Sequence, residues 1–334
     1  MDAYSSPYQQ PPAPLPPERN PVYKRQERKN LSRIGWALTL YLLIVSLLST
    51  ALFMGAETFF PSIAEHQFFD LFVQLIPTYA IGFPLFAGLL IGMPKKAPKK
   101  KKLGFGGWIT FLAISFFLMM AGNYIAIGLM NFVETLKGSE ITNLIGQQIN
   151  DSHPLKNLIL MVLVAPIVEE LMCRKLIIDR LLPYSEVLAV TVSGVFFGLL
   201  HGNFYQFFYA TFLGLLFSIV YTKTGRIGYT IVMHMILNFT GSIIADFIGD
   251  ITAAGSTTSI NPWEVVASIY SAAMLVLAVC GAILLLRKIK KLNLKKTGER
   301  FLTLKTQFKL MAGSAGTIVY FIICLLTFIS SLYI

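Results

Sequence analysis

The stretch LILMVLVAPIVEELMCRKLII, residues 158–178, decides how this chain is interpreted. It is apolar for long enough to cross a bilayer, which takes about 20 helical residues, yet it contains Glu169, Glu170 and Arg174. A charged side chain near the bilayer centre costs about 2.5–3.5 kcal/mol on insertion scales. Such groups are expected to pair and to face a protein-lined polar cavity, so the stretch predicts a functional site within the membrane.

The remainder of the chain has the composition of a membrane protein. Of 334 residues, 55% are hydrophobic and 13% are charged, and the mean hydropathy is +0.64, more apolar than a soluble domain of this size can bury. We predict an all-α, polytopic membrane helical bundle of about nine transmembrane helices. The expected spans are 34–56, 69–93, 108–132, 155–178, 187–200, 204–221, 227–248, 265–286 and 310–333. The run 187–200 is short for a span.

Basic residues gather in alternate loops, within 19–33, 95–102, 223–226 and 287–300, while the other loops are mostly acidic. Because short loops rich in Lys and Arg stay cytoplasmic, we expect a cytoplasmic N-terminus, an outer C-terminus and an odd number of spans. The net charge of +11 is then mostly a collar that contacts the anionic head groups of membrane lipids. Nucleic-acid binding is not expected, because no soluble module combines basic residues with exposed aromatics.

Two domains are expected. Residues 1–32 are polar and proline-rich and predict a disordered cytosolic tail, and residues 33–334 form the membrane helical domain. The first apolar run is full length and starts after about 33 residues, which predicts a retained anchor and not a signal peptide. We expect an integral, multi-pass protein, and its compact length and lack of sorting signals favour a prokaryotic cell membrane over the endoplasmic reticulum.

Two histidines lie within apolar runs. His201 ends one run, with Phe197 one turn earlier, and His234 lies in another with Asn238 four residues later on the same helical face. Either histidine alone could be a satisfied interhelical hydrogen bond. Together with the paired carboxylates, the two imidazoles favour a functional site that Phe197 would wall.

Counting residues places these groups in depth. Glu169 and His234 each lie about 14 Å from the cytoplasmic end of their helix at 1.5 Å per residue, whereas His201 lies about 24 Å deep and fits less well. We therefore expect a shared wet pocket beneath the cytosolic surface, which a peptide would enter from the cytoplasm. Pro166 removes a backbone donor and is expected to free a carbonyl for water or substrate, although a kink for packing is equally plausible.

The cysteines carry no catalytic or metal-binding pattern. Cys173, Cys280 and Cys324 all lie within expected spans, and their spacing indicates neither a disulfide framework nor a zinc ribbon. Cys173 is next to Arg174, but a reactive thiolate needs an accessible, electropositive setting. We expect Cys173 to be a buried packing residue.

Three motifs occur in order on hydrophobic helices: Glu-Glu-x-x-x-Arg at 169–174, Phe-x-x-x-His at 197–201 and His-x-x-x-Asn at 234–238. In this order they resemble the CPBP family of intramembrane endopeptidases, which includes CAAX prenyl proteases and bacteriocin-processing or immunity proteins. The resemblance covers about residues 155–250, the expected family core. It implies hydrolysis of a peptide bond in a C-terminal or precursor peptide, including a lipidated-protein substrate.

The resemblance also implies a role for each matching residue. Glu169 would act as general base on a water molecule that His201 helps to orient. His234 and Asn238 would donate hydrogen bonds to the oxyanion of the tetrahedral intermediate. A supporting layer would consist of Glu170, Arg174 and Phe197, and the four-residue separation of the first two suits an ion pair on one helix.

Three alternatives stay open. Glu169, His201 and His234 could hold a zinc ion with an open position, but we favour chemistry without a cofactor because Asn238 beside His234 suits hydrogen-bond donation. Intramembrane carboxylates and histidines also occur as relays in proton- or ion-coupled transporters, although no inverted repeat is evident. A non-catalytic family member in immunity or regulation is the third alternative, which a Glu169→Gln variant would separate from an enzyme.

Overall fold

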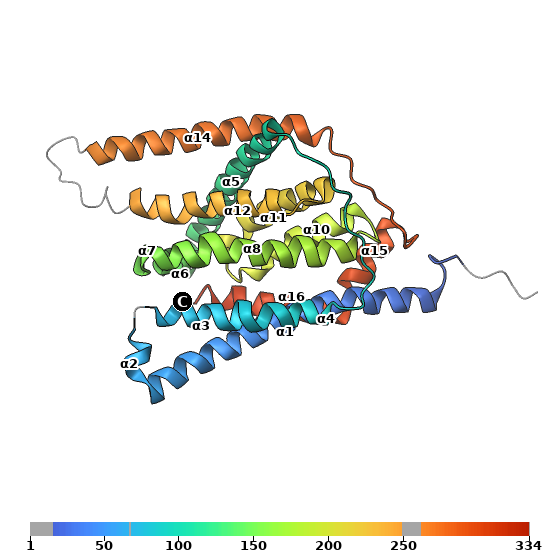
Figure 1. The fold of residues 1–334 in the computed structure, drawn as a ribbon, viewed down its shortest axis with the longest axis horizontal. Helices are drawn as coiled ribbons and strands as arrows, with labels where there is room; N and C mark the ends of the chain where they lie inside the picture. The colour runs from blue at the N-terminus through green and yellow to red at the C-terminus, as the bar shows by residue number, and fades with distance from the viewer. Residues whose placement is uncertain (1–15, 67, 249–261, 334) are drawn as a thin grey trace, which may run out of the picture.

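The structure, a computed structural model, describes residues 16–66, 68–248 and 262–333, and all regular secondary structure in these ranges is helical (Figure 1). The expected all-α class is therefore confirmed for this part of the chain. The first half contains α1 (Pro21–Phe59), α2 (Pro61–Ala64), α3 (Phe69–Leu75), η1 (Ile76–Gly82), α4 (Phe83–Leu89), α5 (Phe105–Lys137) and α6 (Leu144–Asp151). A continuous helical run follows, composed of α7 (Pro154–Asn157), η2 (Leu158–Val164), α8 (Ala165–Glu170), η3 (Leu171–Ile178) and α9 (Asp179–Leu181). The remaining elements are α10 (Glu186–Leu200), α11 (Phe204–Thr224), α12 (Gly228–Asn238), η4 (Phe239–Ile244), α14 (Pro262–Ile289), α15 (Leu304–Ala312) and α16 (Ala315–Ser330).

Fewer helices than expected are long and apolar enough to cross a membrane. Among the described residues there are six, and the α15–α16 pair, bent by 61°, makes a possible seventh. The α7–α9 run is helical throughout but carries the charged residues Glu169, Glu170, Arg174 and Lys175, and α10 is an apolar helix of only 15 residues. The structure thus supports six to seven candidate spans, and the expected nine are not confirmed.

The helical run α7–α9 lies at the centre of the bundle. Figure 1 shows α1, α3, α4 and α16 on one side of it and α5, α11, α12 and α14 on the other. The hairpin of α10 and α11 packs against η3, and α12 packs against α8 and η2. The largest apolar cluster surrounds η3 and α10, with buried Met172, Cys173, Ile177, Leu188 and Phe196. The chemistry-bearing segment is therefore held from several directions.

Helix α1 begins earlier than expected. Asn20 caps its N-terminus by accepting from two backbone N–H groups of the first turn. Glu27 is only 1% exposed and pairs with Arg300 at 3.0 Å, which ties the start of α1 to the loop before α15. The expected disordered tail, residues 1–32, therefore extends too far, since residues 21–32 belong to α1. Their polarity suggested disorder, but it did not reveal the N-cap or the buried ion pair. Residues 1–15 lie outside the described part.

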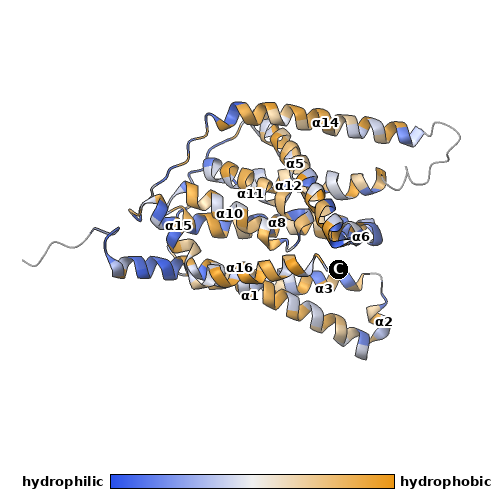
Figure 2. Cartoon of the chain, turned by 180° about the vertical axis from the view of Figure 1, so that it is seen from behind, coloured by the Kyte–Doolittle hydropathy of each residue, from blue (hydrophilic) through white to orange (hydrophobic). Residues whose placement is uncertain are grey.

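The bundle has two polar ends, which Figure 2 shows as hydrophilic residues at both tips of largely hydrophobic helices. We call one the basic end; it contains the loops 90–104, 182–185, 225–227 and 290–303. Its loops bind one another, for example through Lys96 and Glu299 at 2.6 Å. The opposite end contains 60–66, 138–153, 201–203 and 331–333, and there Lys156 pairs with Asp70 at 2.8 Å.

Candidate active site

A cavity of about 710 Å³ lies among α5, α6, the α7–α9 run, the α10–α11 hairpin and α12. Its walls include Glu169, His201, His234 and Asn238, together with Phe197. Residues from three helical segments, up to 69 positions apart in the sequence, thus contribute to one space. The structure brings together the residues that the three motifs singled out.

A register change in the central helical run sets the position of Asn238. The N–H of Ala165 bonds to the carbonyl of Leu160, five residues earlier. Pro166 comes next and has no N–H, so in the same register the Met161 carbonyl lacks a main-chain donor. The Nδ2 group of Asn238 donates to that carbonyl at 2.7 Å. Pro166 therefore frees a carbonyl, as expected, but Asn238 occupies it where we had expected water or substrate.

The two adjacent carboxylates have different surroundings. The side chain of Glu170 is completely buried, whereas that of Glu169 is 31% exposed and lines the cavity. Neighbouring residues of a helix project about 100° apart, which allows one side chain to face the cavity and the other to face the protein interior. The expectation that the pair would have two roles agrees with this arrangement.

Glu170 lies between two cationic or potentially cationic groups. Its Oε2 is 3.0 Å from Nε of Arg174, and its Oε1 is 3.3 Å from Nδ1 of His234. The Arg174 guanidinium stacks over the Phe197 ring at 4.7 Å and the Phe217 ring at 5.7 Å. A buried charge is strongly destabilising when it has no partner, so this cluster compensates the two charges where water cannot reach them.

His234 connects the buried cluster to the cavity. Because the Glu170 carboxylate accepts, a proton on Nδ1 points toward it, and Nε2 then faces Glu169 at 3.8 Å from its Oε2. The rings of Phe197 and Phe217 hold the imidazole at centroid distances of 5.7 and 5.8 Å. A proton on Nε2 would therefore point to the cavity.

His201 caps the C-terminal end of α10. Its Nδ1 is 2.8 Å from the Phe197 carbonyl, which can only accept, so Nδ1 carries the proton and the neutral ring presents Nε2 as an acceptor. Helix α10 is about 22 Å long at 1.5 Å per residue and turns at Gly202, whose φ is +67°. The hairpin therefore ends within the bundle beside the cavity, which brings His201 to Glu169 despite its greater counted depth.

Several groups of the site carry no sequence signal. Tyr209 lines the cavity, and its ring lies 6.4 Å from that of His201. The Ser193 hydroxyl lies 3.5 Å from Arg174 Nη1 and donates to the Cys173 carbonyl at 3.0 Å. Isolated tyrosines and serines in apolar helices are common, so no spacing pattern distinguishes these two. All three cysteines are free, and Cys173 is buried.

The side chains do not form a ready metal site. Among the residues that the structure describes, no group of three or more His, Cys, Asp or Glu is placed to hold a metal ion. The set considered from the sequence, Glu169, His201 and His234, would have to direct its donors to one point. In the described part of the chain these three side chains do not do so.

The comparison with protein families agrees with the motifs. Residues 151–240 match the model of a family described as type II CAAX prenyl endopeptidase Rce1-like. This match is consistent with a CPBP intramembrane protease and confirms the resemblance drawn from the sequence. Searches of curated proteins and of solved structures gave no match. The family match and the long apolar helices together support an integral, multi-pass membrane protein.

Proposed function

We propose that this protein is a glutamate-dependent intramembrane endopeptidase that cleaves a C-terminal or precursor peptide, lipidated or not. The observation that supports the proposal most is the shared cavity, in which the Glu169 carboxylate and Nε2 of His234 lie 3.8 Å apart and His201 forms another wall. These are the groups that peptide hydrolysis needs: a base, an acceptor that orients water, and donors for an oxyanion.

In the proposed reaction, Glu169 takes a proton from a water molecule that also donates to Nε2 of His201. The resulting hydroxide attacks the peptide carbonyl carbon, and the carbonyl oxygen becomes an oxyanion. Glu169 then gives its proton to the departing amine as the C–N bond breaks, which leaves a new carboxyl end. General acid–base catalysis of this kind contributes about 100- to 10,000-fold to a rate.

The oxyanion would be stabilised by His234 and Asn238. His234 would donate from Nε2, while the Glu170 carboxylate, 3.3 Å from Nδ1, holds the other side of the ring. One Nδ2 hydrogen of Asn238 bonds to Met161, and the second is left for the oxyanion. Preorganised donors need no reorientation during the reaction, and removal of one commonly costs about 100- to 1,000-fold in rate.

We propose that no cofactor takes part. The hydrogen-bonding assignments of His201 and His234 described above already use their nitrogens for water and oxyanion, without a ligand role. Zinc is the alternative, and it would make cleavage sensitive to a chelator and restorable by added zinc. Cleavage that persists after prolonged treatment with a chelator is the expected result.

We further propose about nine membrane crossings: the six candidate spans, the bent α15–α16 pair, the α7–α9 run and the shorter α10, which packs within the bundle. The basic end would face the cytoplasm and contact anionic lipid head groups. A prokaryotic cell membrane is the proposed location.

The test is cleavage of a peptide library by purified protein, with products identified by mass spectrometry. Glu169→Gln is expected to lower kcat/KM by about 100- to 10,000-fold, because glutamine cannot accept the water proton. Glu57→Gln, an exposed carboxylate in the last turns of α1, is the matched control and should cleave normally. Equal cleavage by Glu169→Gln would contradict the role proposed for Glu169, and no cleavage by the wild type would favour a non-catalytic or transport role.

A further inference from the structure

The walls of the catalytic cavity reach only one end of the bundle. Besides the groups described above, they include Asn143, Gly146 and Asn150 of the α6 region and Asp246 beyond η4. These positions belong to the opposite end, where α6 and α7 lie beside α2 and the C-terminus in Figure 1. No described residue from the loops of the basic end lines this cavity.

Toward the basic end the cavity is closed by packed side chains. Glu170, Arg174, Phe217 and Ser218 are all fully buried directly beyond Glu169 and His234. A peptide arriving from the basic end would have to separate the Glu170–Arg174 ion pair and leave two buried charges without partners. The expected pocket beneath the cytosolic surface, entered from the cytoplasm, is therefore not what the structure contains.

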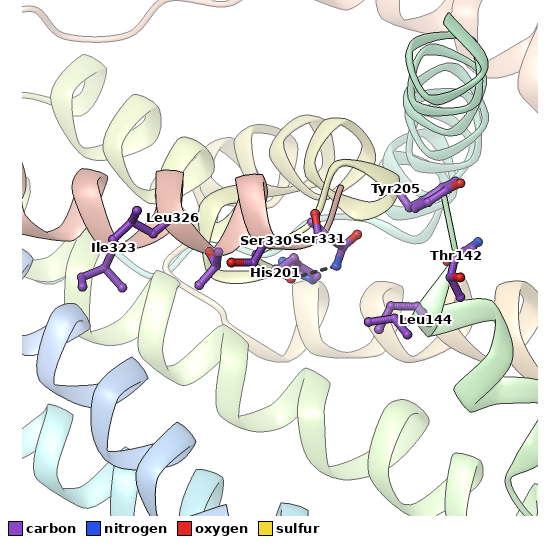
Figure 3. A pocket seen from close by; sticks show the side chains of 13 residues that line it. Thr142, Leu144, His201, Tyr205, Ile323, Leu326, Ser330 and Ser331 are labelled. Atoms are coloured by element: carbon purple, nitrogen blue, oxygen red, sulfur yellow. Dashed lines mark hydrogen bonds between the residues drawn. The ribbon is translucent and has the colours of Figure 1, made fainter. Parts of the chain in front are cut away.

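A second, largely apolar pocket joins the cavity beside His201. It measures about 440 Å³ and lies between the start of α6, the α10–α11 turn and the end of α16. Its wall includes Leu144, Ile323 and Leu326, which Figure 3 shows around His201. Both spaces share Asn143, Ile145, His201 and Tyr205. We call this space the side groove; it can hold apolar side chains close to the reacting groups.

We propose that the substrate is an apolar peptide segment that reaches Glu169 from the opposite end and places apolar side chains next to the cleaved bond in the side groove. Since the loops of the basic end carry the Lys and Arg residues that stay cytoplasmic, the entrance is on the extracytoplasmic face. This inference rests on the proposed function. The substrate class is a peptide, or the end of a membrane-inserted chain, exposed on the outer surface.

Cysteine accessibility tests the position of the entrance without using activity. In a Cys280→Ser background, single cysteines replace Asn150 at the cavity mouth, Ser62 elsewhere at the opposite end, and Lys100 at the basic end. A membrane-impermeant maleimide added to intact spheroplasts is expected to label Asn150→Cys and Ser62→Cys, and Lys100→Cys only after permeabilisation. Labelling of Lys100→Cys with protection of Asn150→Cys would overturn the inference.

Cleavage in sealed vesicles tests the route itself. The wild-type protein is reconstituted, its orientation is read from the Lys100→Cys variant prepared identically, and a membrane-impermeant apolar peptide is added outside. Cleavage of the peptide is expected only where the basic end faces the vesicle lumen. Maleimide labelling of the Asn150→Cys variant should abolish this cleavage, whereas labelling of the Ser62→Cys variant should not. Cleavage only from the basic end would refute the inference alone. No cleavage from either face, with labelling as expected, would refute the proposed function instead.

The side groove is tested by changing its shape. Leu326→Trp fills the groove, and Leu325→Trp places the same ring on the adjacent exposed position of α16, which does not line it. The peptide-library profile of Leu326→Trp is expected to lose large apolar residues near the cleaved bond, whereas that of Leu325→Trp should match the wild type. Identical profiles for all three proteins would overturn the assignment of the groove.

Discussion

At the residue scale, Glu170 is the most constrained group in the site. It has no solvent exposure, and its two oxygens face Arg174 and His234 at 3.0 and 3.3 Å. The charge of Arg174 is further stabilised by two aromatic rings, as cation–π contacts are in desolvated settings. The Glu-Glu-x-x-x-Arg motif thus provides one carboxylate for the cavity and one for the support behind it.

Removal of Arg174 should therefore destabilise the protein strongly. Arg174→Met leaves the Glu170 carboxylate buried beside a histidine alone, and losing one partner of a buried pair costs about 3–5 kcal/mol. The free energy of unfolding, from denaturant titration in detergent, measures this. The control is Lys96→Met, whose pair with Glu299 is exposed on both sides, with the two side chains 52% and 63% exposed, and which should cost about 1 kcal/mol or less.

The double variant Glu170→Gln/Arg174→Met sharpens this prediction. With both charges removed, much of the lost stability should return, because no unpaired charge is left in the interior. If the losses of stability from the two single changes simply added in the double variant, the two charges would not stabilise each other as described.

At the element scale, the helical run α7–α9 departs from regular α-helix at η2, just before Pro166, and Asn238 joins this segment to α12. We expect Asn238→Ala to destabilise by about 1–3 kcal/mol, because the Met161 carbonyl is left without a donor. Adding Pro166→Ala supplies a backbone N–H that can bond to that carbonyl, so the double variant should regain part of the loss. Unfolding titrations of the four proteins in the cycle measure the coupling, and strict additivity would contradict the bond's role.

Close helix contacts fix α11, which carries Tyr209, against α5. A Cβ on Gly122 would lie 2.4 Å from the Tyr209 backbone, whereas one on Gly128 of the same helix meets nothing within 4 Å. Gly122→Ala should therefore lower the melting temperature and the cleavage rate, because α11 must shift. Gly128→Ala should be neutral or stabilising by about 0.5–1 kcal/mol. Equal melting temperatures would argue against the tight contact.

The sequence predicted some of these helices and missed other features of them. Long apolar runs such as 108–132 identified membrane helices because burial in lipid requires about 20 apolar residues. The start of α1 was missed, because its first turns are polar and are held by the distant Arg300. The bond between Asn238 and Met161 was also out of reach, since it depends on a helical register and on a neighbour 77 positions away.

At the scale of the whole molecule, α1 begins and α16 ends at opposite ends of the bundle. Helix α1 starts at the basic end, and the Leu332 carbonyl, after α16, accepts from Lys137 Nζ at 2.7 Å at the other (Figure 1). With the basic end in the cytoplasm, a reporter fused to the C-terminus should be extracytoplasmic and one fused to the N-terminus cytoplasmic. Reporters on the same side would require an even number of crossings and contradict the arrangement.

The grouping of the site residues could be predicted, but the open side of the cavity could not. Glu169 lies about 18 Å from the end of α9 and about 22 Å from the start of α7 at 1.5 Å per residue. A residue so near the middle of a bundle is almost equally deep from either face. The two faces differ only in their packing. Arg174 and Phe217 close the cavity on one face, and the loop around α6 leaves it open on the other.

The most direct test of the central claim is an experimental structure of the protein with a peptidyl phosphinate, whose tetrahedral phosphorus mimics the intermediate and should bind more tightly than substrate. The account predicts one phosphinyl oxygen within hydrogen-bond distance of His234 Nε2 and Asn238 Nδ2, and the other beside Glu169 and His201. A phosphinate bound away from these four side chains, or bound to a metal ion held between them, would contradict it.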